Sequence, residues 1–211
     1  MKKELVKKIG IGALAIASIV TIGGSMAYFT DQESTTNNFT VGEIAVELHE
    51  DKWDALVDKN GNGMPDVAEN MTPTLQIVKD PSAKNIGKDP AYIYLKVTVP
   101  YKNLITANAD GTRNAKAYVE LYNFTKKDGW TQLSRTVNPE QTEVEYVFYY
   151  NEIVQVGDQT TTLFDTITTA NFIEGQIDGT KMQMPVEAIA IQTTNTGTQA
   201  EAYTKYLNQN K

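Results

Sequence analysis

Apolar and polar residues alternate with a period of two along much of the chain, which is typical of strands that present one face to a core. The clearest stretch is residues 91–100, AYIYLKVTVP. Turn sequences rich in Gly, Asn and Asp separate the alternating stretches, which are residues 75–78, 91–100, 117–124, 143–154 and 185–194. Many short strands at this spacing predict an all-β fold, an antiparallel jelly-roll-like β-sandwich.

Two stretches depart from this alternation and favour short helices. Residues 53–58 form one of them, and residues 199–207, QAEAYTKYL, form the other. Each is too short to change the fold class, so we expect short helical insertions in a β-sandwich.

An alternating stretch near the N-terminus follows a polar segment. Residues 28–38 are rich in Ser, Thr, Asn and Gln and are not expected to fold alone. The apolar positions then change parity across Gly42, which indicates a bulge or kink. We therefore interpret residues 28–48 as a tether that carries a candidate assembly strand, whose residues are Phe39, Val41, Gly42, Ile44, Val46 and Leu48.

Residues 1–27 have the pattern of a secretory signal peptide. A lysine-rich start precedes an apolar run over residues 9–24, and the small residues Ser25 and Ala27 favour cleavage between Ala27 and Tyr28. The alternative is an uncleaved anchor, for which the run is short and glycine-rich. The expected organisation is a signal peptide over residues 1–27 and a single β-sandwich domain over residues 28–211.

Composition and charge narrow the classes of partner and of chemistry that the chain can support. The full chain has a net charge of −7, and without residues 1–27 it keeps 15 basic and 25 acidic residues, a net charge of −10. A body this acidic does not favour nucleic acid or an anionic membrane as partners, but it attracts divalent cations. The chain has no cysteine, which excludes disulfides and thiol catalysis.

The most specific local motif is DKNGNGMPDVAE, residues 58–69. Its spacing is that of a twelve-residue calcium loop, with Gly63 at the sharp turn. Pro65 lacks the N–H that would pair two such loops, so we expect a lone loop of modest Ca²⁺ affinity. The alternative is a turn that binds nothing. The candidate ligands are Asp58, Asn60, Asn62, Met64 through its carbonyl, Asp66 and Glu69.

Catalytic patterns are weak by comparison. His49 is the single histidine and no H-E-x-x-H occurs, so a solvated histidine at a strand end is favoured over a zinc ligand. The chain has no G-x-S-x-G, and no pair of acids is singled out for glycoside hydrolysis. We predict no catalytic residues.

The N-terminal region resembles the TasA/camelysin family of secreted proteins of Gram-positive bacteria. The specific part is the junction after the apolar run, followed by a polar stretch and an alternating strand. Weaker similarities occur at residues 84–99, 161–168 and 186–206. The residues that carry the junction pattern are Gly23, Gly24, Ala27, Tyr28, Phe29, Thr30, Asp31, Phe39, Gly42, Ile44 and Val46.

This resemblance implies a jelly-roll subunit of extracellular fibres in the biofilm matrix, cut by a dedicated signal peptidase. It also implies that the N-terminal segment completes the sheet of the next subunit, which would make the protein a homopolymer with possible accessory matrix proteins. The calcium loop resembles an insertion before Leu75 rather than a general family feature.

Two alternatives remain open at this stage. Camelysin relatives have been described as cell-surface metallopeptidases, against which the single histidine argues. The third interpretation is a calcium-stabilised surface domain that binds host or matrix ligands.

Overall fold

The computed structural model describes residues 30–34, 37–39, 44–62, 64–69, 71–177 and 182–209, with side chains described from residue 44 onward. Within these residues the chain is mostly strands, with three short helices. All the strand pairs are antiparallel. The predicted all-β sandwich with short helical insertions is confirmed.

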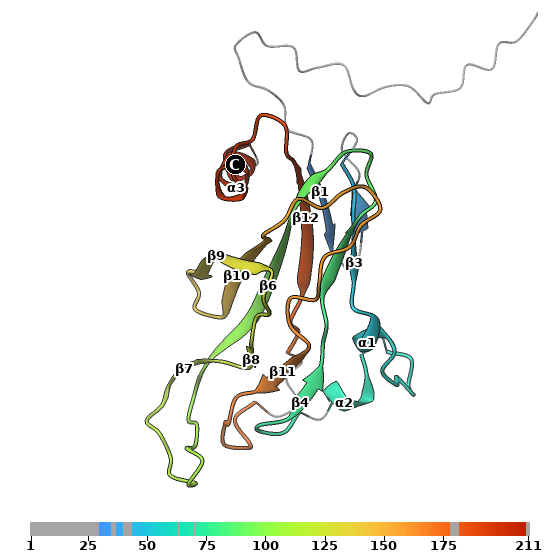
Figure 1. The fold of residues 1–211 in the computed structure, drawn as a ribbon. Coiled ribbons are helices and arrows are strands. Elements are labelled where there is room, and N and C mark those ends of the chain that lie inside the picture. Colours follow the sequence, from blue (N-terminus) through green and yellow to red (C-terminus); the bar gives the residue numbers. More distant parts are fainter. Residues whose placement is uncertain are drawn as a thin grey trace, which may run out of the picture.

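The larger layer is a seven-stranded sheet that curls around the core (Figure 1). Strand β6 lies in its middle and is long enough to pair with β12 and β10 along its sides and with β7 near its end. The strands in spatial order are β2 (Asn37–Phe39), β1 (Thr30–Ser34), β12 (Val186–Gln192), β6 (Ala91–Leu104), β10 (Glu143–Tyr150) and β9 (Trp130–Val137), with β7 (Ala117–Glu120) on β6.

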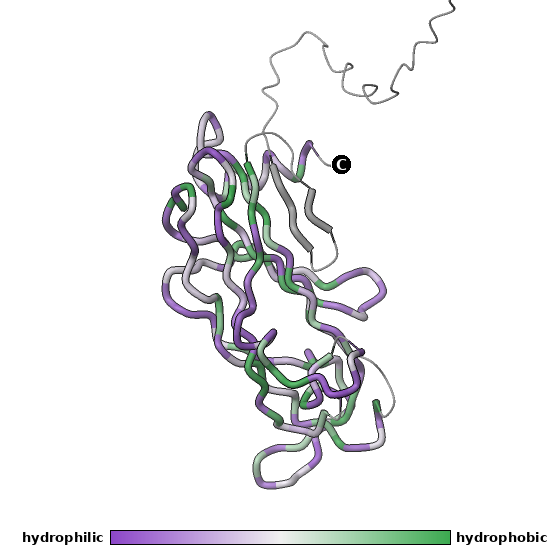
Figure 2. The backbone as a smooth tube through the Cα atoms, turned by 90° about the vertical axis from the view of Figure 1, so that its right-hand side faces the viewer, coloured by the Kyte–Doolittle hydropathy of each residue, from purple (hydrophilic) through white to green (hydrophobic). Residues whose placement is uncertain are grey.

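The facing layer consists of two smaller sheets. One has the order β4 (Gln76–Val78), β11 (Thr166–Thr169) and β8 (Tyr122–Phe124), and the other pairs β3 (Val46–His49) with β5 (Ser82–Asn85). Hydrophilic residues lie mainly in the projecting loops, and hydrophobic residues lie mainly along the strands (Figure 2). The layers therefore hold the core between them, as in a β-sandwich.

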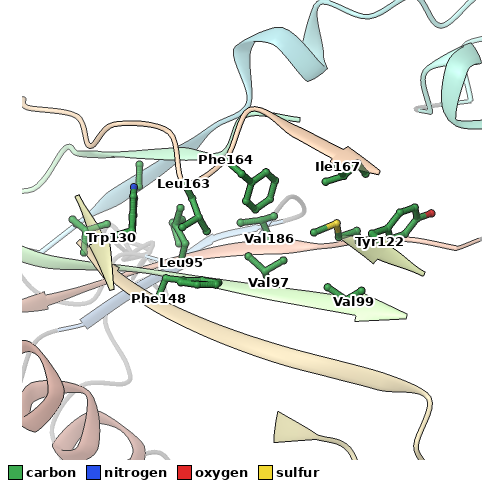
Figure 3. Packing of buried hydrophobic residues seen from close by; sticks show 14 of the residues in the cluster. Leu95, Val97, Val99, Tyr122, Trp130, Phe148, Leu163, Phe164, Ile167 and Val186 are labelled. Carbon is green, nitrogen blue, oxygen red and sulfur yellow. The ribbon is translucent and has the colours of Figure 1, made fainter. Parts of the chain in front are cut away.

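The main core lies on one face of β6. Leu95, Val97 and Val99 point from β6 toward Phe164 and Ile167 of the facing layer (Figure 3). The sequence placed these β6 residues on one face by their period of two, and their side chains are completely buried.

The opposite face of β6 is covered by the C-terminal helix α3 (Gln199–Gln209). Tyr94 and Tyr203 meet there with ring centroids 5.1 Å apart, and Ile189 and Ile191 of β12 join them. The Tyr94 hydroxyl donates to the Gln199 carbonyl at 2.7 Å, which fixes the start of the helix to the sheet. Beneath α3 the sheet is therefore buried on both faces.

Local caps define where the helices begin. In α3, Thr198 N–H donates to the Glu201 carboxylate and Glu201 N–H donates back to the Thr198 hydroxyl, a capping box. Helix α1 (Asp51–Asp54) is capped from a distance, because the Asp80 carboxylate accepts from the Lys52 and Trp53 amides at 3.0 and 3.2 Å. Helix α2 (Asp66–Glu69) closes the Asp/Asn-rich loop.

The predicted elements compare well with the observed ones, with specific exceptions. The helix expected at residues 53–58 is observed earlier, at residues 51–54, and the helix expected at residues 199–207 is confirmed. The strand expected over residues 117–124 is divided into β7 and β8, which belong to different sheets. Strands β5, β9 and β11 were not predicted, because their sequences lack clear alternation. Strand β1 was not predicted either, because it lies within residues 28–38, which were expected to be a polar tether and instead pair with β12 over residues 30–33.

Replacing Phe164 with alanine tests the position of the core. Phe164 is fully buried and its ring lies 4.6 Å from that of Phe124, so Phe164→Ala should cost about 3–5 kcal/mol in the free energy of unfolding. Urea unfolding followed by circular dichroism measures this loss. Val156→Ala is the control, since Val156 is 49% exposed and should change stability little. A loss below about 1 kcal/mol for Phe164→Ala would contradict the core described here.

Candidate functional site

Strand β1 joins the large sheet through β12 and bears the hairpin partner β2 on its other side. Its register pairs Thr30 with Ile191 and Glu33 with Ala188. Strand β2 returns along β1 and pairs Phe39 with Gln32. The backbone of residues 30–39, where it is described, is thus attached to the rest of the large sheet along one side.

The predicted assembly strand is divided between two places in the fold. Phe39 belongs to β2, whereas Val46 and Leu48 belong to β3 and pair with β5. Ile44 and Val46 are buried in the subunit's own core, and Leu48 packs against that core. Val41, Gly42 and the expected cleavage pair Ala27 and Tyr28 lie outside the described residues.

The side chains of the Asp/Asn-rich loop converge at one point. The side-chain amides of Asn60 and Asn62 each donate to Oε1 of Glu69 at 2.6 Å, which brings together positions 3, 5 and 12 of the predicted calcium loop. The Asp58 carboxylate accepts from the Gly61 amide at 2.7 Å. Asp66 faces Lys59 instead, accepting from its backbone amide at 2.9 Å.

This arrangement brings together part of the predicted ligand set. The side chains of Asn60 and Asn62 meet at Glu69 Oε1, and Met64 N–H donates to the Asn62 side-chain oxygen at 2.8 Å, which holds the Met64 backbone close to Asn62. The amide oxygens of Asn60 and Asn62 accept from the backbone N–H groups of Asn62 and Met64 at 3.1 and 2.8 Å, so the amide nitrogens are the atoms that face Glu69. Gly63 lies outside the described residues.

His49 faces two acidic side chains at the end of β3. Its Nε2 lies 3.4 Å from Glu47 and its Nδ1 lies 3.7 Å from Asp51. Within the part of the chain that the structure describes, no group of three or more His, Asp or Glu side chains is arranged to hold a metal ion.

A buried ion pair lies beside the calcium-loop candidate. Lys79 Nζ is 2.8 Å from each carboxylate oxygen of Glu50, and both side chains are less than 10% exposed. The ammonium group of Lys79 also lies 4.5 Å above the ring of Trp53. Burial raises the pKa of the Glu50 carboxyl above its usual value, and Lys79 opposes that rise.

Glu50, Lys79 and Trp53 line a cavity of about 200 Å³. The remaining lining is largely apolar and includes Met64 of the loop and Tyr122 of β8. Burial raises the pKa of Tyr122 to about 12, so its hydroxyl stays protonated and acts as a donor. Sequence reasoning missed this cavity, because its walls come from segments far apart in the chain.

The comparisons with known proteins confirm the resemblance to the TasA/camelysin family. Residues 1–98 match the family described as camelysin metallo-endopeptidase. No curated protein and no solved structure matches the chain. Over the residues that the structure describes, no helix is both long and apolar enough to cross a membrane.

The buried ion pair gives a pH-dependent prediction. Lys79→Met should lower the free energy of unfolding by about 3–5 kcal/mol near pH 7, because Glu50 is left charged and buried. The pKa of Glu50 in the folded variant would then lie well above its unfolded value near 4.5. The lost stability should therefore return as the pH falls through that folded pKa.

Urea unfolding of Lys79→Met and of the unmodified protein, near pH 7 and near pH 4, measures how the loss of stability depends on pH. The matched control is the double variant Lys79→Met/Glu50→Gln, which removes both charges and should recover much of the loss near pH 7. An equal loss at both pH values for Lys79→Met would show that Glu50 does not carry the effect.

Proposed function

We propose that this chain, whose first 98 residues match the camelysin family, is a secreted structural subunit that assembles into extracellular fibres by donating its N-terminal strand. The observation that carries the proposal is the position of β1. Within the part of the chain that the structure describes, β1 pairs with β12 near one edge of the large sheet, and its hairpin partner β2 lies beyond it.

The subunit body has an extensive core among the side chains that the structure describes. Among the side chains that the structure describes, the core begins at Ile44 and extends through β6, β12 and the facing sheets. In this proposal, the departure of residues 30–39 breaks the β1–β12 ladder. The part of the assembly strand from Ile44 to Leu48 stays with its own subunit in this proposal.

Departure of β1 would open the edge of β12 between Ala188 and Ile191. An open edge next to a buried sheet gains main-chain hydrogen bonds when another strand is added. The matching strand of a second copy has the same sequence and can restore the same register. Exchange that passes from each copy to the next does not close on itself, so it propagates as a filament.

The competing function is the metallopeptidase activity named in the family description. A peptidase zinc site usually combines two or three nitrogen ligands, whereas this sequence has a single histidine. The third candidate, a calcium-stabilised surface domain, shares the loop but needs no strand exchange. A secreted matrix or cell-surface location follows from the proposed fibre role and from the predicted signal peptide.

The filament prediction tests the fibre role. Protein that begins at Tyr28 should form filaments visible by negative-stain electron microscopy, and protein that lacks residues 28–39 should stay monomeric. A synthetic peptide of residues 28–39 should bind the shortened protein at one peptide per subunit, because it restores the β12 edge. A scrambled peptide of the same composition is the control.

Monomers from the complete mature chain, or filaments from the shortened chain, would contradict the proposal. Peptide binding measured by calorimetry also reports whether the shortened protein is folded. Casein hydrolysis that a chelator blocks would favour the peptidase instead.

We also propose that residues 58–69 bind Ca²⁺. The convergence of Asn60, Asn62 and Glu69 supports this, together with the twelve-residue spacing. Calorimetric titration should show one site with a dissociation constant of roughly 10⁻⁴–10⁻³ M, the range of extracellular modules. Asp58→Ala should weaken binding, whereas Asp110→Ala, in an exposed turn elsewhere, should not. Absence of binding heat from the unmodified protein would refute the proposal.

A further inference from the structure

All four methionines that follow residue 27 line the same cavity. They are Met64, Met71, Met182 and Met184. The two other methionines of the sequence, Met1 and Met26, belong to the predicted signal peptide. The cavity has a volume of about 200 Å³ and lies at the end of the molecule where α1, α2 and β4 gather (Figure 1).

These methionines reach the cavity from separate segments. Met64 lies in the Asp/Asn-rich loop, Met71 follows α2, and the remaining two precede β12. The Tyr122 hydroxyl contacts the Met71 sulfur at 2.8 Å and donates to the Met182 carbonyl at 2.9 Å. One side chain of β8 therefore holds two of the methionine-bearing segments together.

Methionine also fills irregular gaps in ordinary cores because it is flexible and polarizable. One feature distinguishes this cavity from such packing. Met184 belongs to the main core, and Met71 and Met182 pack against it, yet all four methionines line a space of about 200 Å³ that the core does not fill.

We propose that this methionine pocket binds a soft monovalent cation, Cu(I) or Ag(I). Thioether sulfur is a soft, uncharged ligand that selects Cu(I) over Ca²⁺ or Mg²⁺. Thioethers need no deprotonation, so binding requires no group in the pocket to release a proton. The proposal is independent of the fibre role.

The other groups that line the pocket suit such a cation. The carboxylate of Glu50 faces the cavity beside Lys79, so the pair adds no net charge. The Lys79 ammonium group lies 4.5 Å above the Trp53 ring and occupies that aromatic face, so the methionine sulfurs are the soft donors that the pocket offers.

The sequence contains few other ligands that would compete for a soft metal ion. The chain has no cysteine and a single histidine, so His49 is the one other side chain with a strong affinity for soft metals. His49 is not among the residues that line the pocket. The variant His49→Gln therefore removes the competing site and leaves the methionines unchanged.

Silver ion is the probe, because it is redox-stable and shares the ligand preference of Cu(I). The complete mature protein, with ¹³C-labelled methionine methyl groups, is titrated with silver nitrate in chloride-free buffer and followed by NMR. We expect methionine methyl resonances to shift and saturate at one silver ion per subunit. The melting temperature should rise, because the ion joins three segments of the folded state.

The matched variant is Met71→Leu/Met182→Leu, which nearly conserves side-chain volume and should keep the fold. Its affinity for silver should fall at least tenfold, whereas His49→Gln should retain the affinity of the unmodified protein. Anaerobic competition with a Cu(I) chelator extends the measurement to copper.

Methionine methyl resonances that do not move during the titration would overturn the proposal, and this readout needs no variant. Equal silver affinity in the double leucine variant, or loss of binding in His49→Gln, would also overturn it.

Discussion

Burial of β6 on both faces is the constraint on which the rest of the fold depends. One face carries Leu95, Val97 and Val99 into the main core, and the other carries Tyr92 and Tyr94 under helix α3. Strands β10 and β12 flank β6, and the far side of each must hydrogen-bond to a further strand. The position of β1 follows from this, because it supplies the partner on the other side of β12.

The sequence predicted best those elements whose side chains alternate between core and cover. Strand β6 could be located because its apolar positions have a period of two, whereas β10 was recognised by its aromatic residues and β12 by its run of apolar residues. Strand β9 has exposed or half-exposed residues along most of its length, so its sequence, WTQLSRTV, lacks that signal. The short strands β5 and β11 are defined by the partners they meet, which a local pattern does not reveal.

The division between β7 and β8 has a similar cause. Leu121, between them, donates its amide to the Pro100 carbonyl, after which the chain passes from the large sheet to the facing one. For the candidate sites, the loop ligands could be predicted because twelve consecutive residues contain them. The Glu50–Lys79 pair and the distant Asp80 cap depend on packing between segments about thirty residues apart.

Met64 joins the two candidate metal sites while offering a different atom to each. Its carbonyl is a predicted ligand of the proposed calcium loop, and its side chain lines the proposed methionine pocket. Any event that tightens the loop therefore also changes one wall of the pocket. The two sites compete for no ligand atom, because hard and soft cations select different donors.

The β1–β12 ladder also has a mechanical consequence. Its hydrogen bonds run across the strands, perpendicular to the strand axis. A pull along β1 therefore loads these bonds together in shear, whereas a pull perpendicular to the strand would open them one after another. A strand held in this way resists tension along its own axis but can be peeled sideways by a weaker force. Stretching and remodelling of such a fibre would then follow different routes through the same few bonds.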